Sequence, residues 1–307
     1  MIIASIDMGT NTIRLLIAKK CKDCEFKYLY QDSQIARIGE GFGKSKIISK
    51  SALIRTERIL LEYKNKILSY KVDKVFVVAT SAVRESENGK WFVDLIRKET
   101  GFNIEVINSD YEAYLTQKGI TYSLKEKVKN LKWCAFDLGG GSTEFILSKS
   151  EKLIDSFSIP LGVVKLLEKF IKNDPPCIDE LESVRKFFVE SLKSSINSKF
   201  KDIDLLVGNA GTVTSIAAID MKIDKYSYEK TEGYLINKSS IENILDELLE
   251  TDGIERLKKF PILKKGREDV ITIGVFIVLA IMELFNKNEI MVTNGSLREG
   301  ILIEHAC

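Results

Sequence analysis

Histidine is almost absent from this chain: His305 is the only one among 307 residues. A single histidine argues against a Ser-His-Asp catalytic arrangement, and it excludes metal centres that need several imidazole ligands. A catalytic base is therefore expected to be a carboxylate, a lysine, a tyrosine or a cysteine.

The five cysteines lack the pattern of a disulfide framework, because they are odd in number and lie scattered at positions 21, 24, 134, 177 and 307. The segment Cys21-Lys-Asp-Cys24 is compatible with a redox pair or with half of a zinc site. Zinc takes four ligands, however, and no second cysteine pair follows. We favour a turn between two strand-like stretches at 15–20 and 26–30.

The chain also lacks an excess of either charge, since 46 basic residues stand against 44 acidic ones and leave a net charge of +2. No global field therefore marks it as a nucleic-acid binder. We predict no nucleic-acid partner, and a phosphate-rich ligand would have to be held by local cations.

Long hydrophobic runs are missing as well. The longest, 270–285, is interrupted by Thr272, Gly274 and Glu283, and it is shorter than the ~20 residues that a membrane span requires. The sequence begins with a strand-like stretch and no basic region, so no signal peptide is visible. We expect a cytosolic protein with no membrane partner.

Two aspartate-glycine loops, 130 positions apart (137 − 7), are the most informative feature that is present. Residues 6–11 read Ile-Asp-Met-Gly-Thr-Asn, and residues 136–144 read Phe-Asp-Leu-Gly-Gly-Gly-Ser-Thr-Glu. Each lies between two apolar stretches, which predicts a hairpin with a tight turn. Glycines let the backbone approach an anion, and successive N–H groups form an anion site. The carboxylate can hold a cation that bridges to phosphate. Together the loops predict a phosphate clamp.

The order of predicted elements in the first 122 residues, βββαβαβα, is broadly repeated in the second half. Such a repeat indicates a duplication, and 307 residues suit two domains. The predicted fold class is α/β, with a boundary in the polar stretch 123–132. Later helices are predicted at 162–172, 178–200, 238–250, 267–285 and 296–304, and another is predicted to start at Thr212.

The paired loops resemble those of the actin-like ATPase and sugar-kinase superfamily. The residues of the second loop and of five other motifs more specifically resemble the exopolyphosphatase and guanosine-pentaphosphate phosphatase family. Six motifs carry this resemblance, in the family's order: Asp137 to Glu144, Ala79-Thr-Ser-Ala-Val-Arg84, Ser109-Asp-Tyr-Glu-Ala113, Pro160-Leu-Gly-Val-Val-Lys165, Gly208-Asn-Ala-Gly-Thr212 and Asn294-Gly-Ser-Leu-Arg-Glu-Gly300. With the first loop, they run over nearly the whole chain.

The resemblance implies two similar actin-like (ribonuclease H-like) domains with an interdomain cleft. Because the last helix of such folds returns to the first domain, we expect 1–124 plus 294–307 as domain I and 125–293 as domain II. Because one phosphate loop would come from each domain, the clamp could assemble only when the domains are close. We therefore expect open and closed forms, with hinges near 123–132 and near Asn294-Gly295.

The catalytic residues implied by the resemblance are Arg84, Glu112, Asp137 and Glu144. Arg84 follows a predicted buried strand, and a guanidinium binds phosphate through two parallel hydrogen bonds. Ser109-x-x-Glu112 alone would be a capping box, but the family's catalytic glutamate aligns with Glu112. We expect Glu112 to be the general base, although Tyr111 replaces a second glutamate that relatives usually carry.

Asp137 and Glu144 are predicted on the two arms of one hairpin. Paired carboxylates suit Mg²⁺, which takes few protein oxygens and keeps several waters. The alternative is a turn aspartate that caps its own backbone and a solvated glutamate. The glycine-rich match to the family favours Mg²⁺ as the cofactor.

The remaining candidates are phosphate- or substrate-binding residues: Asp7, Gly9, Thr10, Asn11, Arg14, Gly139, Gly140, Gly141, Ser142, Thr143, Gly211, Thr212 and Arg267. Arg14 has a solvent-facing strand position as its alternative. Gly211 and Thr212 would face an anion at a helix N-terminus, or else form an ordinary tight turn. Arg267 is predicted at another helix start.

One glycine-rich stretch, 39–45, looks like a P-loop. Its spacing fails, because position 38 is Ile38, and the stretch instead matches the family's Gly-Glu-Gly loop. The lysines at 44–50 could line a polyphosphate path, but a solvated loop is favoured.

The predicted function is a Mg²⁺-dependent phosphohydrolase that releases terminal phosphate from inorganic polyphosphate or the 5′ phosphate of guanosine pentaphosphate. Two alternatives stay open at this point. One is an actin-like kinase or ATPase, and the other is a sensor that binds alarmone or polyphosphate without hydrolysis.

Overall fold

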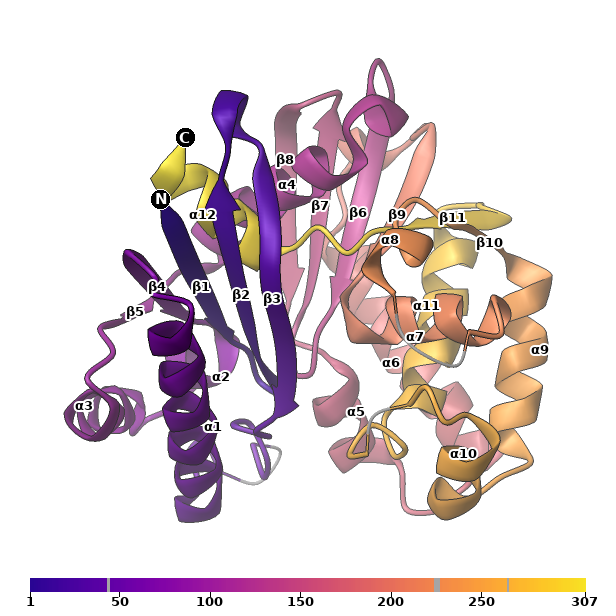
Figure 1. Cartoon of the computed structure of the whole chain (residues 1–307). Coiled ribbons are helices and arrows are strands. Elements are labelled where there is room, and N and C mark those ends of the chain that lie inside the picture. Colours follow the sequence, from indigo (N-terminus) through magenta and orange to yellow (C-terminus); the bar gives the residue numbers. More distant parts are fainter. Residues whose placement is uncertain (43–44, 224–226, 264) are drawn as a thin grey trace. The chain divides into compact units, whose positions relative to one another are not determined.

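The computed structural model describes residues 1–42, 45–223, 227–263 and 265–307 (Figure 1). The chain divides into two compact units, the first made of Met1–Tyr122 and Gly295–Cys307 and the second of Ser123–Asn294. The predicted divisions at 124/125 and 293/294 lie two residues (124 − 122) and one residue (294 − 293) from these points. Lys44, within the P-loop-like stretch, falls outside the described residues.

The first unit is built on a five-stranded sheet of order β3-β2-β1-β4-β5. Its strands are β1 (Ile2–Met8), β2 (Thr12–Lys20), β3 (Phe26–Ile35), β4 (Lys74–Ala79) and β5 (Ile104–Val106). The hairpins β1–β2 and β2–β3 are antiparallel, whereas β4 runs parallel to both β1 and β5. The predicted first hairpin is therefore confirmed.

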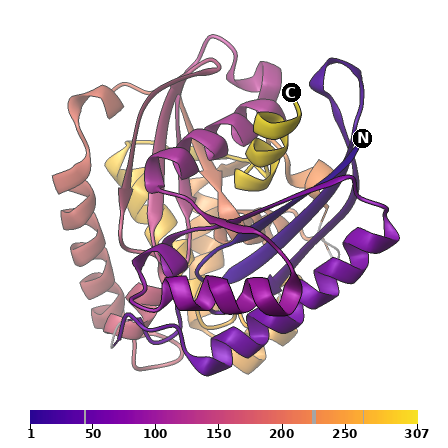
Figure 2. The ribbon, with the colours of Figure 1, turned by 90° about the vertical axis from the view of Figure 1, so that its left-hand side faces the viewer.

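Helices cover both faces of this sheet (Figure 2). They are α1 (Lys50–Ser69), α2 (Ser81–Glu85), α3 (Gly89–Thr100), α4 (Ser109–Leu124) and α12 (Leu297–Ala306). Ile6 and alternate residues of β1 pack with Tyr63 of α1 and Phe92 of α3. Ile3, on the opposite face, packs with Leu302 of α12. The period-two alternation of β1 thus separates two cores.

The second unit repeats this topology on a six-stranded sheet of order β10-β11-β9-β6-β7-β8. Its strands are β6 (Lys132–Leu138), β7 (Thr143–Lys149), β8 (Lys152–Ile159), β9 (Leu205–Asn209), β10 (Leu235–Asn237) and β11 (Glu289–Val292). From β8 to β11, each neighbouring pair has the same sense as its counterpart from β3 to β5. This is the outcome that the repeated order of elements predicts.

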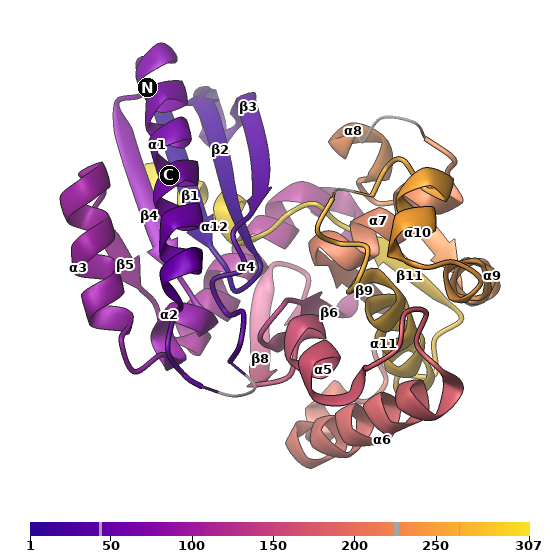
Figure 3. The ribbon, with the colours of Figure 1, turned by 90° about the horizontal axis from the view of Figure 1, so that it is seen from below.

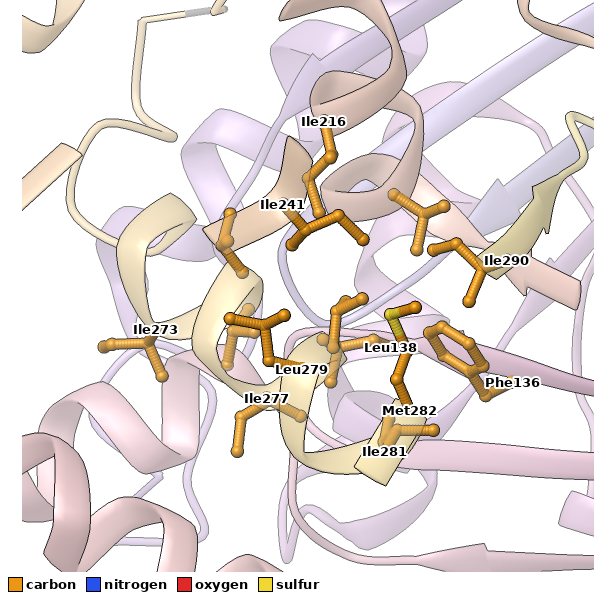
Figure 4. Packing of buried hydrophobic residues seen from close by; sticks show 14 of the residues in the cluster. Phe136, Leu138, Ile216, Ile241, Ile273, Ile277, Leu279, Ile281, Met282 and Ile290 are labelled. Carbon is orange, nitrogen blue, oxygen red and sulfur yellow. The ribbon is translucent and has the colours of Figure 1, made fainter. Parts of the chain in front are cut away.

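The helices of the second unit enclose its main core. They are α5 (Val163–Phe170), α6 (Ile178–Ser195), α7 (Ala210–Asp220), α8 (Tyr228–Thr231), α9 (Lys238–Leu249), α10 (Gly253–Lys259) and α11 (Ile271–Leu284). Figure 4 shows Ile277 and Ile281 of α11 in the cluster that also holds Phe136 of β6. A helix that is apolar on all sides belongs in a core. Across the described residues, every helix is too short or too polar to cross a membrane.

Three local predictions were wrong. Helix α11 begins at Ile271, four residues after the predicted start at Arg267 (271 − 267), and α7 begins at Ala210 rather than Thr212. The helix predicted to reach residue 200 ends at Ser195, because Ile196 is extended. The short elements α2, α8, β10 and α10 were missed, since three to seven residues are too few to establish a period.

Helix α12 is packed backbone to backbone against α4. A Cβ atom on Gly119 would overlap the Ser296 carbonyl oxygen, and one on Gly300 would overlap that of Leu115. Lys118 of α4 also forms an ion pair with Glu304 of α12. The motif at 294–300 therefore holds α4 in place, because Ser296 and Glu299 form the capping box that starts α12.

The close contact predicts an unusual sign for Gly119→Ala. Within a helix, this exchange ordinarily stabilises by up to about 1 kcal/mol. Here the added methyl group meets the Ser296 backbone, so we expect destabilisation of about 1–3 kcal/mol, as in overpacked cores. Urea unfolding of both proteins measures the difference, and an alanine variant at least as stable as the parent would contradict this packing.

Candidate active site

The first glycine loop is a tight turn between β1 and β2. The Gly9 N–H donates to the Thr12 carbonyl at 3.0 Å, and a Cβ on Gly9 would lie only 3.3 Å from that oxygen. A side chain at position 9 would therefore crowd the carbonyl that closes the turn, which favours glycine there.

The carbonyl groups of this loop are engaged by the segment that follows β3. The Asn11 carbonyl accepts from Ala36 and Arg37 N–H groups at 3.0 and 2.9 Å, and the Thr10 carbonyl accepts from Gly39 N–H at 3.0 Å. A Cβ on Gly39 would overlap the Thr10 methyl group. The segment at 36–39, which leads into the Gly-Glu-Gly stretch, thus supports the first loop. Its N–H groups form hydrogen bonds with loop carbonyl oxygens that would otherwise repel an anion.

Asp7 and Arg14 are directly opposite each other in the β1–β2 ladder. Opposed residues of an antiparallel pair place their side chains on the same face, about 4.5–5.5 Å apart at Cβ. Asp7 is buried and Arg14 is half-buried. The register therefore places Arg14 beside the loop aspartate.

Arg84 and Glu112 form an ion pair, with the Arg84 Nη1 2.9 Å from the Glu112 Oε2. The same Nη1 donates to the Ile107 carbonyl at 2.9 Å. Both side chains are largely buried, with 21% and 13% of their surface exposed. Hydrogen bonding to a charged partner in such surroundings fixes both groups in orientation.

The capping-box interpretation of Glu112 is contradicted by the helix start. The Asn108 side chain accepts from the Tyr111 N–H at 2.8 Å, so Asn108 is the capping residue of α4. A reciprocal box would need the glutamate at position 111, three residues after the cap, whereas Glu112 is one residue further. Its carboxylate instead accepts from Arg84.

These groups gather at one end of the first sheet. Arg84 lies on α2, directly after β4, and the Thr80 N–H that precedes α2 donates to the Met8 carbonyl at 3.2 Å. Figure 3 views the first unit from the end where β1 turns into β2, with α2 nearby. The carboxyl ends of β1, β4 and β5 are where open α/β sheets bind ligands.

The second glycine loop has the same turn, with the Gly139 N–H donating to the Ser142 carbonyl at 3.1 Å. Its carbonyls are also engaged: Gly139 and Gly140 accept from Val163 and Val164 N–H groups at 3.0 and 2.9 Å. A Cβ on Gly162 would lie 2.5 Å from the Gly139 oxygen. The first turn of α5 therefore packs directly against this loop and is hydrogen-bonded to it.

Thr143 also links the loop to the segment before α5, since its hydroxyl donates to the Leu161 carbonyl at 2.7 Å. That proton is committed to the main chain, so any phosphate contact by Thr143 would come from another of its atoms. Ser142, Thr143 and Gly141 are buried, whereas Gly139 and Gly140 are half-buried.

Asp137 and Glu144 are opposed residues of the β6–β7 ladder, at positions equivalent to Asp7 and Arg14. The Asp137 Oδ2 accepts from the Asn209 Nδ2 at 3.3 Å, and the Glu144 Oε1 accepts from the Ser158 hydroxyl at 2.9 Å. Sequence reasoning missed Asn209 and Ser158 as partners. Asn209 stands within a recognised motif, but only the β7–β8 register places Ser158 beside Glu144.

Within the described residues, no three histidine, cysteine or acidic side chains gather to hold a metal. A pair of carboxylates is nevertheless the protein contribution that Mg²⁺ commonly takes when waters and phosphates complete its shell. The donor set of Asp137 and Glu144 therefore fits Mg²⁺ better than zinc.

Gly211 and Arg267 lie against each other, since a Cβ on Gly211 would overlap the Arg267 guanidinium. The preceding Ala210 has a φ of 71°, an uncommon value for a non-glycine residue. A Cβ on Gly274 would lie 2.6 Å from the Thr212 methyl carbon. Gly211, Thr212 and Arg267 thus form one cluster at the start of α7, where helix N–H groups and a cation favour an anion.

The only histidine plays no part in either loop. His305 is stacked on Phe76 of β4, with ring centroids 4.3 Å apart. The candidate base, Glu112, is one of the residue types that the composition leaves open.

Duplicated sheets, each with a glycine turn beside a carboxylate, are the arrangement that the actin-like fold class predicts. The sequence model of the Ppx/GppA phosphatase family matches residues 16–306. A bifunctional 3-dehydroquinate synthase/phosphatase of Fusobacterium nucleatum is 32% identical over 311 residues, which cover 98% of this chain and 46% of that protein. The chain therefore spans about half the length of that relative. It belongs to the Ppx/GppA phosphatase family.

Three further relatives, one curated protein and two solved structures, agree with this assignment. Exopolyphosphatase 2 of Mycobacterium tuberculosis is 28% identical, over 90% of this chain and 88% of that protein. The crystal structure of the Aquifex aeolicus family member superposes with a TM-score of 0.81 at 33% identity, covering 99% of this chain and 97% of that one. The exopolyphosphatase of Cytophaga hutchinsonii gives a TM-score of 0.90 at 27% identity, covering 98% and 96%. The predicted fold class and family are confirmed.

Proposed function

We propose that this protein is a phosphohydrolase that releases terminal phosphate from inorganic polyphosphate, the 5′ phosphate of guanosine pentaphosphate, or both. The observation that carries the proposal is the ion pair between Arg84 of α2 and Glu112 of α4. This pair lies at the same end of the first sheet as the first glycine loop. The names of two relatives support the substrate class: an exopolyphosphatase and a guanosine-5′-triphosphate,3′-diphosphate pyrophosphatase of Vibrio vulnificus, which is 25% identical.

In the first domain, Glu112 is the proposed general base. The oxygen of a water molecule forms a bond to the terminal phosphorus while the bridging P–O bond breaks. Glu112 takes the proton of that water, and the electron pair of the broken bond leaves with the shortened chain. Arg84 has five N–H donors, of which Nη1 is engaged with Glu112 and Ile107. Its remaining donors can bind phosphate, so one side chain positions both base and substrate.

In the second domain, Asp137 and Glu144 are the proposed Mg²⁺ ligands. The bound cation would neutralise phosphate charge, which is much of what phosphoryl transfer requires. Asn209 and Ser158 hold the two carboxylates in place through the bonds described above. Gly139 to Ser142 and the cluster of Gly211, Thr212 and Arg267 are proposed to bind phosphate oxygens. A cytosolic location, and a part in the stringent response if guanosine pentaphosphate is the substrate, stay predictions.

Phosphate release from polyphosphate, guanosine pentaphosphate and ATP, measured side by side with Mg²⁺, tests the proposal. We expect release from at least one of the first two substrates to exceed release from ATP. Turnover that consumes ATP preferentially would favour a kinase or ATPase. Tight binding of polyphosphate without release would favour a sensor.

Arg84→Lys is expected to lower kcat/KM by ~10-fold or more. Lysine keeps the charge but loses the planar fork that reaches phosphate, Glu112 and the main chain together. A hydrogen bond to a charged group contributes about 1.5–3 kcal/mol, which corresponds to this range. Arg97→Lys, an exposed arginine of α3, is the matched control. Equal kcat/KM in both variants would remove Arg84 from the site.

A further inference from the structure

The turn between β2 and β3 and the end of α12 come together within the first unit, as Figures 1 and 2 both show. The turn contains the short helix η1 (Lys22–Cys24). Cys307 directly follows α12. Two cysteines that are 283 positions apart (307 − 24) thus stand at the meeting point of two elements.

The side chains of Cys24 and Cys307 are neighbours, since the Cys24 thiol contributes to a raised pKa of Cys307. Other contacts hold the end of α12 at this place. The Lys20 ammonium donates to the Ala306 carbonyl, and Leu302 and Ala306 pack with Leu16 and Ala18 of β2. The proximity of the two thiols is therefore built into the packing of α12 on the sheet.

The turn presents Cys24, and not Cys21, to Cys307. The Cys21 thiol donates to the Lys19 carbonyl with its sulfur 3.7 Å away. Hydrogen bonds from Cys21 N–H to the Glu25 carbonyl and from Glu25 N–H to the Lys22 carbonyl, at 2.7 and 3.1 Å, close the turn. Cys24 has a φ of 58°, in the left-handed region that few non-glycine residues adopt. The closed turn fixes that conformation.

We propose that Cys24 and Cys307 form a reversible disulfide when the protein meets a peroxide, and that this bond fastens the end of α12 to the β2–β3 turn. Cys24 is half-buried and Cys307 is exposed, so a small oxidant can reach the pair. The buried Cys134 is not accessible in this way.

The reaction balances with the peroxide as the oxidant. The Cys24 thiolate attacks one peroxide oxygen, giving a sulfenic acid and, with a proton, one water. The Cys307 sulfur then attacks the Cys24 sulfur, and the hydroxide that leaves takes up a proton as a second water. Burial and the neighbouring Cys24 thiol raise the pKa of Cys307 to about 11, which makes Cys307 the poorer first nucleophile. The first attack is therefore assigned to Cys24, and Cys307 gives up its proton as it attacks the sulfenic acid. A dithiol reductant restores both thiols.

A disulfide at the end of α12 would act on a helix that contacts α4, and α4 carries the proposed base. Helix α12 holds α4 through Gly119, Gly300 and the Lys118–Glu304 pair, and Glu112 lies in the first turn of α4. A crosslink at the end of α12 restricts its last turn and closes a long loop, which stabilises the folded unit against unfolding.

The test is disulfide mapping of the full chain after mild peroxide treatment. We expect the count of free thiols, titrated after denaturation, to fall from five to three (5 − 2), with the Cys24 and Cys307 peptides joined. We also expect Tm to rise by about 4 °C and to return on reduction. Cys24→Ser and Cys307→Ser should each abolish both effects, whereas the matched controls Cys21→Ser and Cys177→Ser should keep them.

Three results would overturn the inference. The first is that Cys21–Cys24 is the main disulfide formed. The second is that no disulfide forms at peroxide levels that leave Cys134 reduced. The third is that the Cys24–Cys307 disulfide forms but Tm does not change. Phosphate release by the reduced serine variants should equal that of the parent. The inference does not rest on the proposed hydrolysis, because mapping and Tm are read without substrate.

Discussion

Replacing Glu112 with glutamine is expected to lower phosphate release by ~10²-fold or more, the usual range for loss of a general base. Glutamine has nearly the same shape and can still accept a hydrogen bond from Arg84, so the fold and substrate binding should persist. The loss should therefore appear in kcat, with KM little changed. Steady-state phosphate release from polyphosphate, with Tm as a check on folding, measures it.

Asp110→Asn is the matched control, because Asp110 lies in the same first turn of α4 and is exposed. We expect it to retain nearly full turnover. If Glu112→Gln behaved like this control, the role of Glu112 would be to hold Arg84, and the base would have to be sought elsewhere.

Asp137→Asn and Glu144→Gln are each expected to raise the Mg²⁺ concentration for half-maximal activity by ~10-fold or more. Each amide keeps the size of the side chain but removes the negative charge that attracts a hard cation. Because the two residues are opposed in one ladder, both exchanges should act on the same titration. Activity at graded Mg²⁺ is the measurement, with saturating substrate throughout.

Glu151→Gln is a suitable control, since Glu151 is an exposed carboxylate in the turn between β7 and β8 and lies outside the candidate site. Its Mg²⁺ titration should match that of the parent. A parental titration curve in both Asp137→Asn and Glu144→Gln would mean that the cation is held by other groups.

Features that depend on neighbours in sequence could be predicted. The two hairpins follow from apolar stretches around a glycine turn, and the duplication follows from the repeated order of elements. Asp7 and Arg14 are seven residues apart, as are Asp137 and Glu144. In a hairpin with this turn, that spacing makes the two members of each pair directly opposed. A tight turn of fixed length leaves one register, so local sequence was sufficient.

Features that depend on sheet order could not be predicted. Arg84 meets Glu112 because β4 lies between β1 and β5, which brings α2 beside the start of α4. The Ser158 hydroxyl reaches Glu144 only through the β7–β8 register. Arg267 covers Gly211 although the helix predicted to begin there starts at Ile271. No periodicity in the sequence records these tertiary contacts.

The motif at 294–300 shows how a family signature and a site can differ. The resemblance included it among the motifs of the phosphatase family. In the structure, Ser296 and Glu299 cap α12, and Gly300 allows the close approach to Leu115. These residues therefore place α4 and its glutamate. In this motif, Ser296, Glu299 and Gly300 serve the packing of α12 on α4.

The most direct test of the central claim is hydrolysis in heavy-oxygen water, with the released phosphate and the shortened chain analysed by mass. Attack of water on the terminal phosphorus places one heavy oxygen in each released phosphate and none in the remaining chain, and Glu112→Gln should slow that incorporation in proportion to its loss of turnover. Heavy oxygen in the shortened chain, or terminal phosphate recovered on an acceptor molecule, would contradict the account.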